Sequence, residues 1–194
     1  MGQIKSALEI ALERTESVKG DRASIEQFEA KQRGKKLAND FLGDQKINLE
    51  SAVKGTPKEE QRSFRQGLFD VFLSQIALPL TGDDMGRLEA LGKGLAAVIG
   101  GSHFGTVYKQ LIQLLNRYLD EAARYEEAIR QQYAPKLRQK EEELSRRLGR
   151  QLKLDPFQDP EFIAFYNQNM NNLKANYEGA ITQVRAEAER LFGE

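Results

Sequence analysis

A glycine-rich segment carries the residues best suited to binding chemistry. It reads Gly-Gly-Ser-His-Phe-Gly-Thr over residues 100–106 and contains His103, the single histidine of the chain. Free backbone amides at a helix start, together with the positive end of the helix dipole, can bind phosphate or carboxylate. The segment therefore suggests a small-anion or nucleotide site, whose candidate residues are Gly100, Gly101, Ser102, His103, Thr106 and Lys109.

The same segment has a structural interpretation. Glycines supply the positive φ of tight turns, and Ser102 or Thr106 can cap the helix that follows. No Gly-Lys-Ser/Thr triplet follows and no strand is predicted before it, so the phosphate-loop pattern is not met. The ordinary use of glycine in caps and turns favours the structural interpretation.

Catalytic and metal-binding residue sets are not evident in the sequence. The chain has no cysteine, which excludes disulfides, thiolate metal sites and cysteine nucleophiles. One histidine cannot supply the paired Glu-x-x-His motifs of a di-iron bundle, and no nucleophile turn accompanies it. Consecutive glutamates, as in residues 141–143, point to different helix faces. We expect no catalytic residue, no metal site and no cofactor, and the sequence leans against an enzyme. A hydrolytic enzyme stays a third alternative, because a helical site can be built from residues that are distant in sequence.

Charge and hydropathy exclude further classes of partner. The 194 residues carry 29 basic and 29 acidic side chains, so bulk charge attracts neither nucleic acid nor anionic membrane. The densest basic cluster, residues 31–36, lies among acidic residues and has no stacking aromatic. The apolar windows are too short or too interrupted to span a bilayer, and we find no secretory signal. We expect a cytoplasmic protein with no membrane span and no nucleic-acid partner.

Apolar residues recur at steps of three and four along most of the chain, which predicts an all-α fold. Residues 1–100 are predicted to form a compact core of about four helices, with a break between helices at Gly20-Asp21. The pattern Thr56-Pro57-Lys58-Glu59 predicts a helix start at which Thr56 and Glu59 form a capping box.

Residues 101–194 are predicted to form one long antiparallel helical hairpin, a coiled-coil-like arm with its turn near residues 151–159. Pro135 should kink or divide its first helix. Asp159 as N-cap and Pro160 at the first helical position predict the start of the return helix. The first apolar stripe is close to a heptad seam and contains Leu111, Leu115, Tyr118, Ala122, Tyr125, Ile129 and Tyr133.

Folding this hairpin about its turn predicts a register. In it Leu144 meets Tyr166, Leu137 meets Leu173, Tyr133 meets Tyr177, Ile129 meets Ile181, and Tyr118 lies beside Leu191 and Phe192. Residues 136–153 carry seven basic and three acidic side chains, and residues 155–194 carry the reverse. Opposite charges and a short connection favour pairing within one chain. The alternative is a coiled coil in which each helix pairs with another subunit.

All six tyrosines of the chain lie in the predicted hairpin. We predict that five of them form an interface: Tyr118, Tyr125, Tyr133, Tyr166 and Tyr177. With no catalytic residue set evident, this favours a non-catalytic interaction or assembly protein. It would bind a protein partner through its arm, or it would self-associate into a homo-oligomer.

Residues 82–105 contain seven glycines, a density that needs a reason. Each glycine inside a helix costs about 1 kcal/mol relative to alanine. Close helix packing is one explanation, and a hinge or ligand cleft is the other. The cleft would make the protein a small-anion or nucleotide-binding sensor, which is the alternative function.

The opening segment, residues 4–15, reads Ile-Lys-Ser-Ala-Leu-Glu-Ile-Ala-Leu-Glu-Arg-Thr. It resembles the N-termini of uncharacterised bacterial cytoplasmic helical proteins. The resemblance implies a bacterial protein of unknown function and assigns no functional residue.

Overall fold

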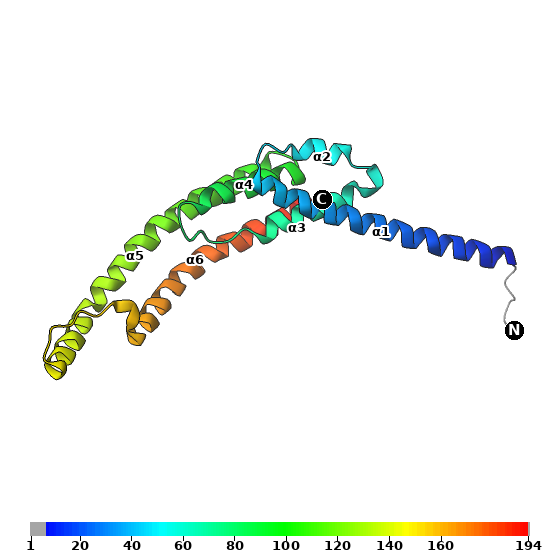
Figure 1. Cartoon of the computed structure of the whole chain (residues 1–194). Helices are drawn as coiled ribbons and strands as arrows, with labels where there is room; N and C mark the ends of the chain where they lie inside the picture. Colours follow the sequence, from blue (N-terminus) through cyan, green and yellow to red (C-terminus); the bar gives the residue numbers. More distant parts are fainter. Residues whose placement is uncertain (1–6, 194) are drawn as a thin grey trace. The chain divides into compact units, whose positions relative to one another are not determined.

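The computed structural model describes residues 7–193, and the side chains of residues 23–193. This range contains no strand, which confirms the predicted all-α class (Figure 1). The elements are α1 (Ala7–Gly43), α2 (Leu49–Gly55), α3 (Lys58–Ser74), α4 (Asp84–Ile99), α5 (His103–Leu148), the 3-10 helix η1 (Pro156–Gln158) and α6 (Pro160–Gly193).

The chain forms two compact units that interleave in sequence. The first contains residues up to Ile76, then Glu89–Gly105, and the residues from Ala188 onward. The second contains Ala77–Leu88 and Thr106–Glu187. We call residues 106–187 the arm, because they comprise most of α5 and α6, which lie side by side in Figure 1.

Helix α1 continues without interruption through Gly20 and Asp21. The predicted division of this region into two helices is therefore wrong. Neither residue is a proline, and one glycine inside a long helix costs only about 1 kcal/mol, so helix propagation continues through it.

In the first unit, α1 and α3 cross with their backbones in contact. A Cβ atom on Gly34 would lie 2.1 Å from the Phe64 carbonyl oxygen, and one on Gly67 would lie 2.1 Å from the Lys31 carbonyl oxygen. Each helix therefore needs a glycine where the other passes. The basic cluster of α1 contributes to the same crossing, since Lys31 pairs with Asp70 at 2.8 Å and Arg33 pairs with Glu60.

The core of the first unit gathers phenylalanines around this crossing. The Phe41 and Phe72 rings meet edge to face at 5.7 Å, and Phe72 is fully buried. A Cβ atom on Gly94 would lie 2.7 Å from the Phe72 ring, so one glycine of the 82–105 segment serves close packing. By contrast, added Cβ atoms on Gly82, Gly86, Gly100, Gly101 and Gly105 would meet nothing within 4 Å.

The predicted capping box at Thr56 does not form. The Thr56 hydroxyl donates instead to the Ala52 carbonyl at 3.0 Å, and no side chain caps the start of α3. The reason is the short connection, because α2 ends at Gly55 and leaves an open carbonyl within reach of this hydroxyl.

In the second unit, α5 passes through Pro135 as one helix, so it is not divided there. It ends at Leu148, and Gly149 adopts φ +66°. The chain then runs back along α5, because the Leu152 amide donates to Ser145 Oγ at 3.1 Å and the Leu154 amide donates to Glu141 Oε1 at 2.8 Å. The reversal is therefore at Gly149, immediately after the helix.

This early reversal changes the register between α5 and α6. Tyr133 contacts Phe162 at a ring distance of 5.2 Å, and Tyr118 contacts Tyr177 at 5.1 Å. The predicted register, with Tyr133 opposite Tyr177, is wrong by about fifteen residues, close to two heptads. A shift of whole heptads returns the same stripes to contact, so apolar spacing does not distinguish the two registers.

Candidate functional site

Within the arm, tyrosine hydroxyl groups form hydrogen bonds between α5 and α6, and between α5 and the residue that precedes α6. The Tyr177 hydroxyl donates to Glu121 at 2.6 Å, and the Tyr133 hydroxyl donates to Asp159 at 2.9 Å. The hydrogen bond to Glu121, together with burial, raises the pKa of Tyr177 to about 12. The tyrosine therefore stays protonated at neutral pH and keeps donating.

Four of the five predicted interface tyrosines pack between these segments. Tyr118, Tyr133 and Tyr177 are buried, and the half-buried Tyr166 donates to Glu126 at 3.3 Å. Tyr125 is the most exposed of the five, at 39%, and its hydroxyl lies 3.5 Å from Asn169 Oδ1. Whether any of these residues meets a partner stays a prediction.

Asp159 holds the start of α6 against α5. Its Oδ1 accepts from the Glu161 amide at 3.1 Å, which confirms the predicted N-cap, and Pro160 opens the helix as expected. Lys140 Nζ donates to both of its oxygens at 2.8 and 2.9 Å. These bonds and the Tyr133 hydroxyl outweigh burial and lower the pKa of Asp159.

The chemistry available to this cluster is limited. Hydrogen bonds to Asp159 and Glu161 raise the pKa of Lys140, so its amine stays protonated and is not a nucleophile at neutral pH. The Asp159 carboxylate is ionised and engaged by two side chains. The cluster therefore acts as a structural clamp at the end of the arm.

A groove runs between α5 and α6 nearer the other end of the arm. It has a volume of about 510 Å³ and lies between residues 107–117 of α5 and residues 180–187 of α6. Its apolar members are Val107, Leu111, Leu114, Ala180 and Val184, and its polar members are Gln110, Gln113, Gln183, Arg117 and Glu187. Half of its ten lining residues are apolar and only two are charged, a composition that suits contact with another apolar surface.

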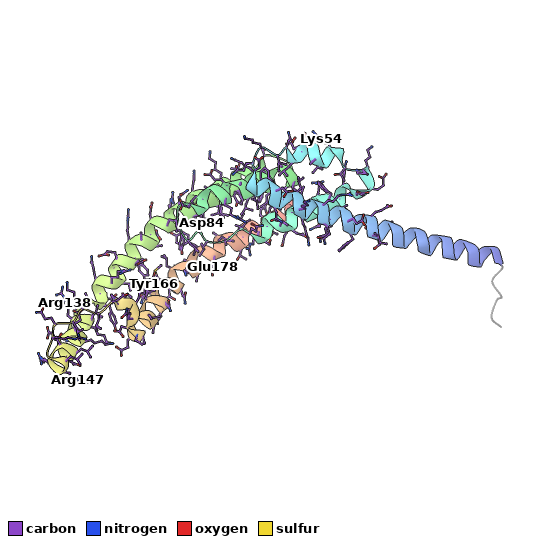
Figure 2. All side chains as sticks on the ribbon, in the orientation of Figure 1. Lys54, Asp84, Arg138, Arg147, Tyr166 and Glu178 are labelled. Atoms are coloured by element: carbon purple, nitrogen blue, oxygen red, sulfur yellow. The ribbon has the colours of Figure 1, made fainter. Side chains whose placement is uncertain are left out.

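A second cavity, which we call the hollow, lies where the loop before α4 meets the arm. It encloses about 300 Å³ and is lined by Pro79, Leu80, Tyr118, Leu119, Ala122, Ala123, Glu126, Tyr166, Asn167, Met170, Asn171 and Lys174. Figure 2 labels Tyr166, which lines the hollow, and Glu178, which lies one helical turn beyond Lys174, the last residue of α6 that does so.

Helix α6 is unusually rich in side-chain amides here. Its residues 162–177 carry one charged side chain, Lys174, although charged residues make up 30% of the chain. The asparagines of this stretch are Asn167, Asn169, Asn171, Asn172 and Asn176. Each costs a helix roughly 0.5 kcal/mol relative to alanine. Reasoning from apolar stripes and charges does not single out these residues, but a count of asparagines within a predicted helix would have.

The predicted anion-binding residues lie around the turn between α4 and α5. Gly100 and Gly101 adopt φ +82° and +78°, the positive φ expected for the tight turn. The six residues, Gly100, Gly101, Ser102, His103, Thr106 and Lys109, are all exposed. Whether they hold an anion stays a prediction.

Within the part of the chain that the structure describes, no group of three or more histidine, aspartate or glutamate side chains is placed to hold a metal ion. Among the same residues, no helix is both long enough and apolar enough to cross a membrane.

Comparison with known proteins assigns the chain to a family. Residues 50–190 match the Family of unknown function (DUF6657), and the chain belongs to this family. The matched range includes α3, α4, α5 and most of α6, and therefore both the groove and the hollow. No curated protein matches the chain. No solved structure matches it either.

Proposed function

We propose that this protein is a non-catalytic interaction protein whose arm holds an amphipathic helix of a protein partner in the groove. The groove itself carries the proposal. Five of its ten lining residues are apolar, and two antiparallel helices form its walls. Helical peptides bind other proteins by laying an apolar face into such a groove.

The length of the groove fits a helical ligand. Residues 107–117 of α5 form three helical turns, about 15 Å at 1.5 Å per residue. A ligand helix of similar length would present apolar residues at spacings of three and four. The three exposed glutamines that line the groove can form hydrogen bonds with the polar flanks of such a helix, whether or not these flanks are charged.

The charges at the two ends of the groove favour one orientation of the ligand helix. Tyr118 contacts Tyr177, so Arg117 lies toward the Ala180 end and Glu187 toward the Val107 end. A helix has a partial positive charge at its N-terminus and a negative one at its C-terminus. The ligand helix would therefore begin near Glu187 and end near Arg117, parallel to α5.

Site-specific photo-crosslinking in the cells that naturally make the protein tests this proposal. A photoreactive residue at Gln110 stands at the groove, and a matched one at the exposed Asn116, about 120° away around the same helix, does not line it. We expect a partner adduct from position 110 and none from position 116. Equal adducts, no adduct, or only an adduct of two copies of this chain would overturn the partner-helix proposal.

The cellular setting is part of the same proposal. The resemblance of residues 4–15 points to a bacterial cytoplasmic protein, so we place the complex in that compartment. Fractionation of such cells, followed by immunodetection, checks this location.

A further inference from the structure

The hollow is formed by three segments that are distant in sequence. The loop residues Pro79 and Leu80 form one wall, α5 contributes Leu119 among others, and α6 contributes Met170 and Lys174. Asp84 Oδ2 accepts from the Leu80 and Thr81 amides at 2.8 and 3.0 Å. The loop backbone is therefore pinned, while the Leu80 side chain stays 85% exposed beside the hollow.

Two of the polar residues that line the hollow, Glu126 and Tyr166, are already engaged with other groups. The carboxylate of Glu126 accepts from Arg130 at 2.7 Å and from the Tyr166 hydroxyl at 3.3 Å. The Arg130 guanidinium balances the charge of this carboxylate, and each of its two oxygens already accepts a hydrogen bond. The Glu126 side chain is therefore held in place by these contacts and forms part of the lining of the hollow.

The remaining polar residues that line the hollow offer hydrogen-bond donors. Within the described residues Lys174 makes no ion pair, and no hydrogen bond engages the Asn167 or Asn171 amides. Burial and the nearby Glu178 carboxylate raise the pKa of Tyr118, so its hydroxyl also stays protonated and can donate. An ammonium, two carboxamides and a phenol together suit an anion that accepts from several directions.

The hollow favours a carboxylate over a phosphate. Lys174 is the one basic side chain among the residues that line the hollow, and the backbone amides within α6 are bonded along the helix. A single ammonium balances one negative charge, and planar carboxamides match a planar carboxylate. The apolar surface of Leu80, Leu119 and Met170 lies beside these donors and suits an alkyl or aromatic group.

We propose that the hollow binds a carboxylate carried on an apolar group, with Lys174, Asn167 and Asn171 holding the carboxylate and Leu80 covering the apolar part. A free organic acid and the C-terminus of a polypeptide share this chemistry. The hollow shares no lining residue with the groove, so this proposal can be tested independently of the proposed partner helix.

Titration calorimetry on the full chain tests the site with matched probes. The probes are N-acetyl-leucine, N-acetyl-leucinamide, and an octapeptide ending in leucine with a free or an amidated C-terminus. We expect both acids, or the free-ended peptide alone, to bind, and both amides to fail. Binding of the peptide alone indicates a polypeptide terminus, and equal binding of both acids indicates that a small acid suffices. If acid and amide bind equally, or if nothing binds, the proposal is wrong.

Two lysine substitutions assign the binding to the hollow. Lys174→Met should weaken acid binding by about tenfold or more, because it removes a charge-assisted bond. Lys109→Met, an exposed lysine of the same unit near the glycine-rich turn, should leave it unchanged. The opposite pattern would move the anion site to the glycine-rich turn and overturn the assignment. Circular dichroism checks that both variants fold.

Discussion

At the scale of single residues, Asp159 joins three parts of the arm through its carboxylate. It caps α6, pairs with Lys140 and accepts from Tyr133, and its side chain is only 7% exposed. The cap was predictable, because an aspartate directly before a proline is a strong signal for a helix start. The contacts with Lys140 and Tyr133 were not, because they depend on where the chain reverses at Gly149.

Asp159→Asn keeps a capping oxygen but removes the charge that Lys140 binds. We expect it to lower the free energy of unfolding by about 1–2 kcal/mol, as for loss of a charge-assisted hydrogen bond. Urea denaturation followed by circular dichroism measures the change. Asp120→Asn replaces an exposed aspartate on α5 and should change stability by less than about 0.5 kcal/mol. Equal effects of both substitutions would contradict the clamp.

The same carboxylate gives the clamp a pH dependence with a definite sign. The pKa of Asp159 is lowered in the folded protein, whereas an unfolded aspartate titrates near about 3.9. The stabilisation is therefore complete above about pH 4 and is lost as the pH falls through the folded pKa. The stability difference between the natural protein and Asp159→Asn should stay constant from about pH 5 to 8 and shrink below about pH 4. A difference that grows on acidification would refute this sign.

At the scale of elements, the α1–α3 crossing and the register of the arm show what sequence patterns miss. Gly34 lowers helix propensity, yet it is the residue that lets α3 approach. The register was wrong because stripes that repeat every seven residues match again after a shift of two heptads. The glycine after Leu148 was the available signal, since glycine commonly ends a helix and reverses the chain.

Replacing a glycine by alanine should have opposite effects on stability at the α1–α3 crossing and at an open position elsewhere. Gly34→Ala or Gly67→Ala would drive a methyl group into a backbone carbonyl, so each should destabilise the protein by about 1–3 kcal/mol. Gly86→Ala, in α4, meets nothing within 4 Å and should stabilise it by about 0.5–1 kcal/mol. Thermal unfolding of the three variants gives the comparison. Destabilisation of similar size in all three would show that helix propensity does not explain Gly86 and that close approach does not explain the other two.

At the scale of the whole molecule, the all-α class followed from apolar spacing, but the division into units did not. Residues 77–88 belong to the second unit, although the segments on both sides of them belong to the first. The residues from Ala188 onward belong to the first unit, although the rest of α6 belongs to the second. Such membership depends on contacts between distant segments, which periodicity within a segment does not encode. The groove and the hollow are also lined by residues from distant segments. The sequence pattern identifies the types of these residues, but it does not predict which of them lie close together in the fold.

The most direct test of the proposed function places photoreactive residues on both walls of the groove, at Gln113 of α5 and at Gln183 of α6. Mass spectrometry then identifies the protein crosslinked from each position and the residues modified in it. We predict the same partner from both walls, modified within one helix at spacings of three, four or seven residues. Different proteins from the two walls, or modified residues without helical spacing, would contradict the account.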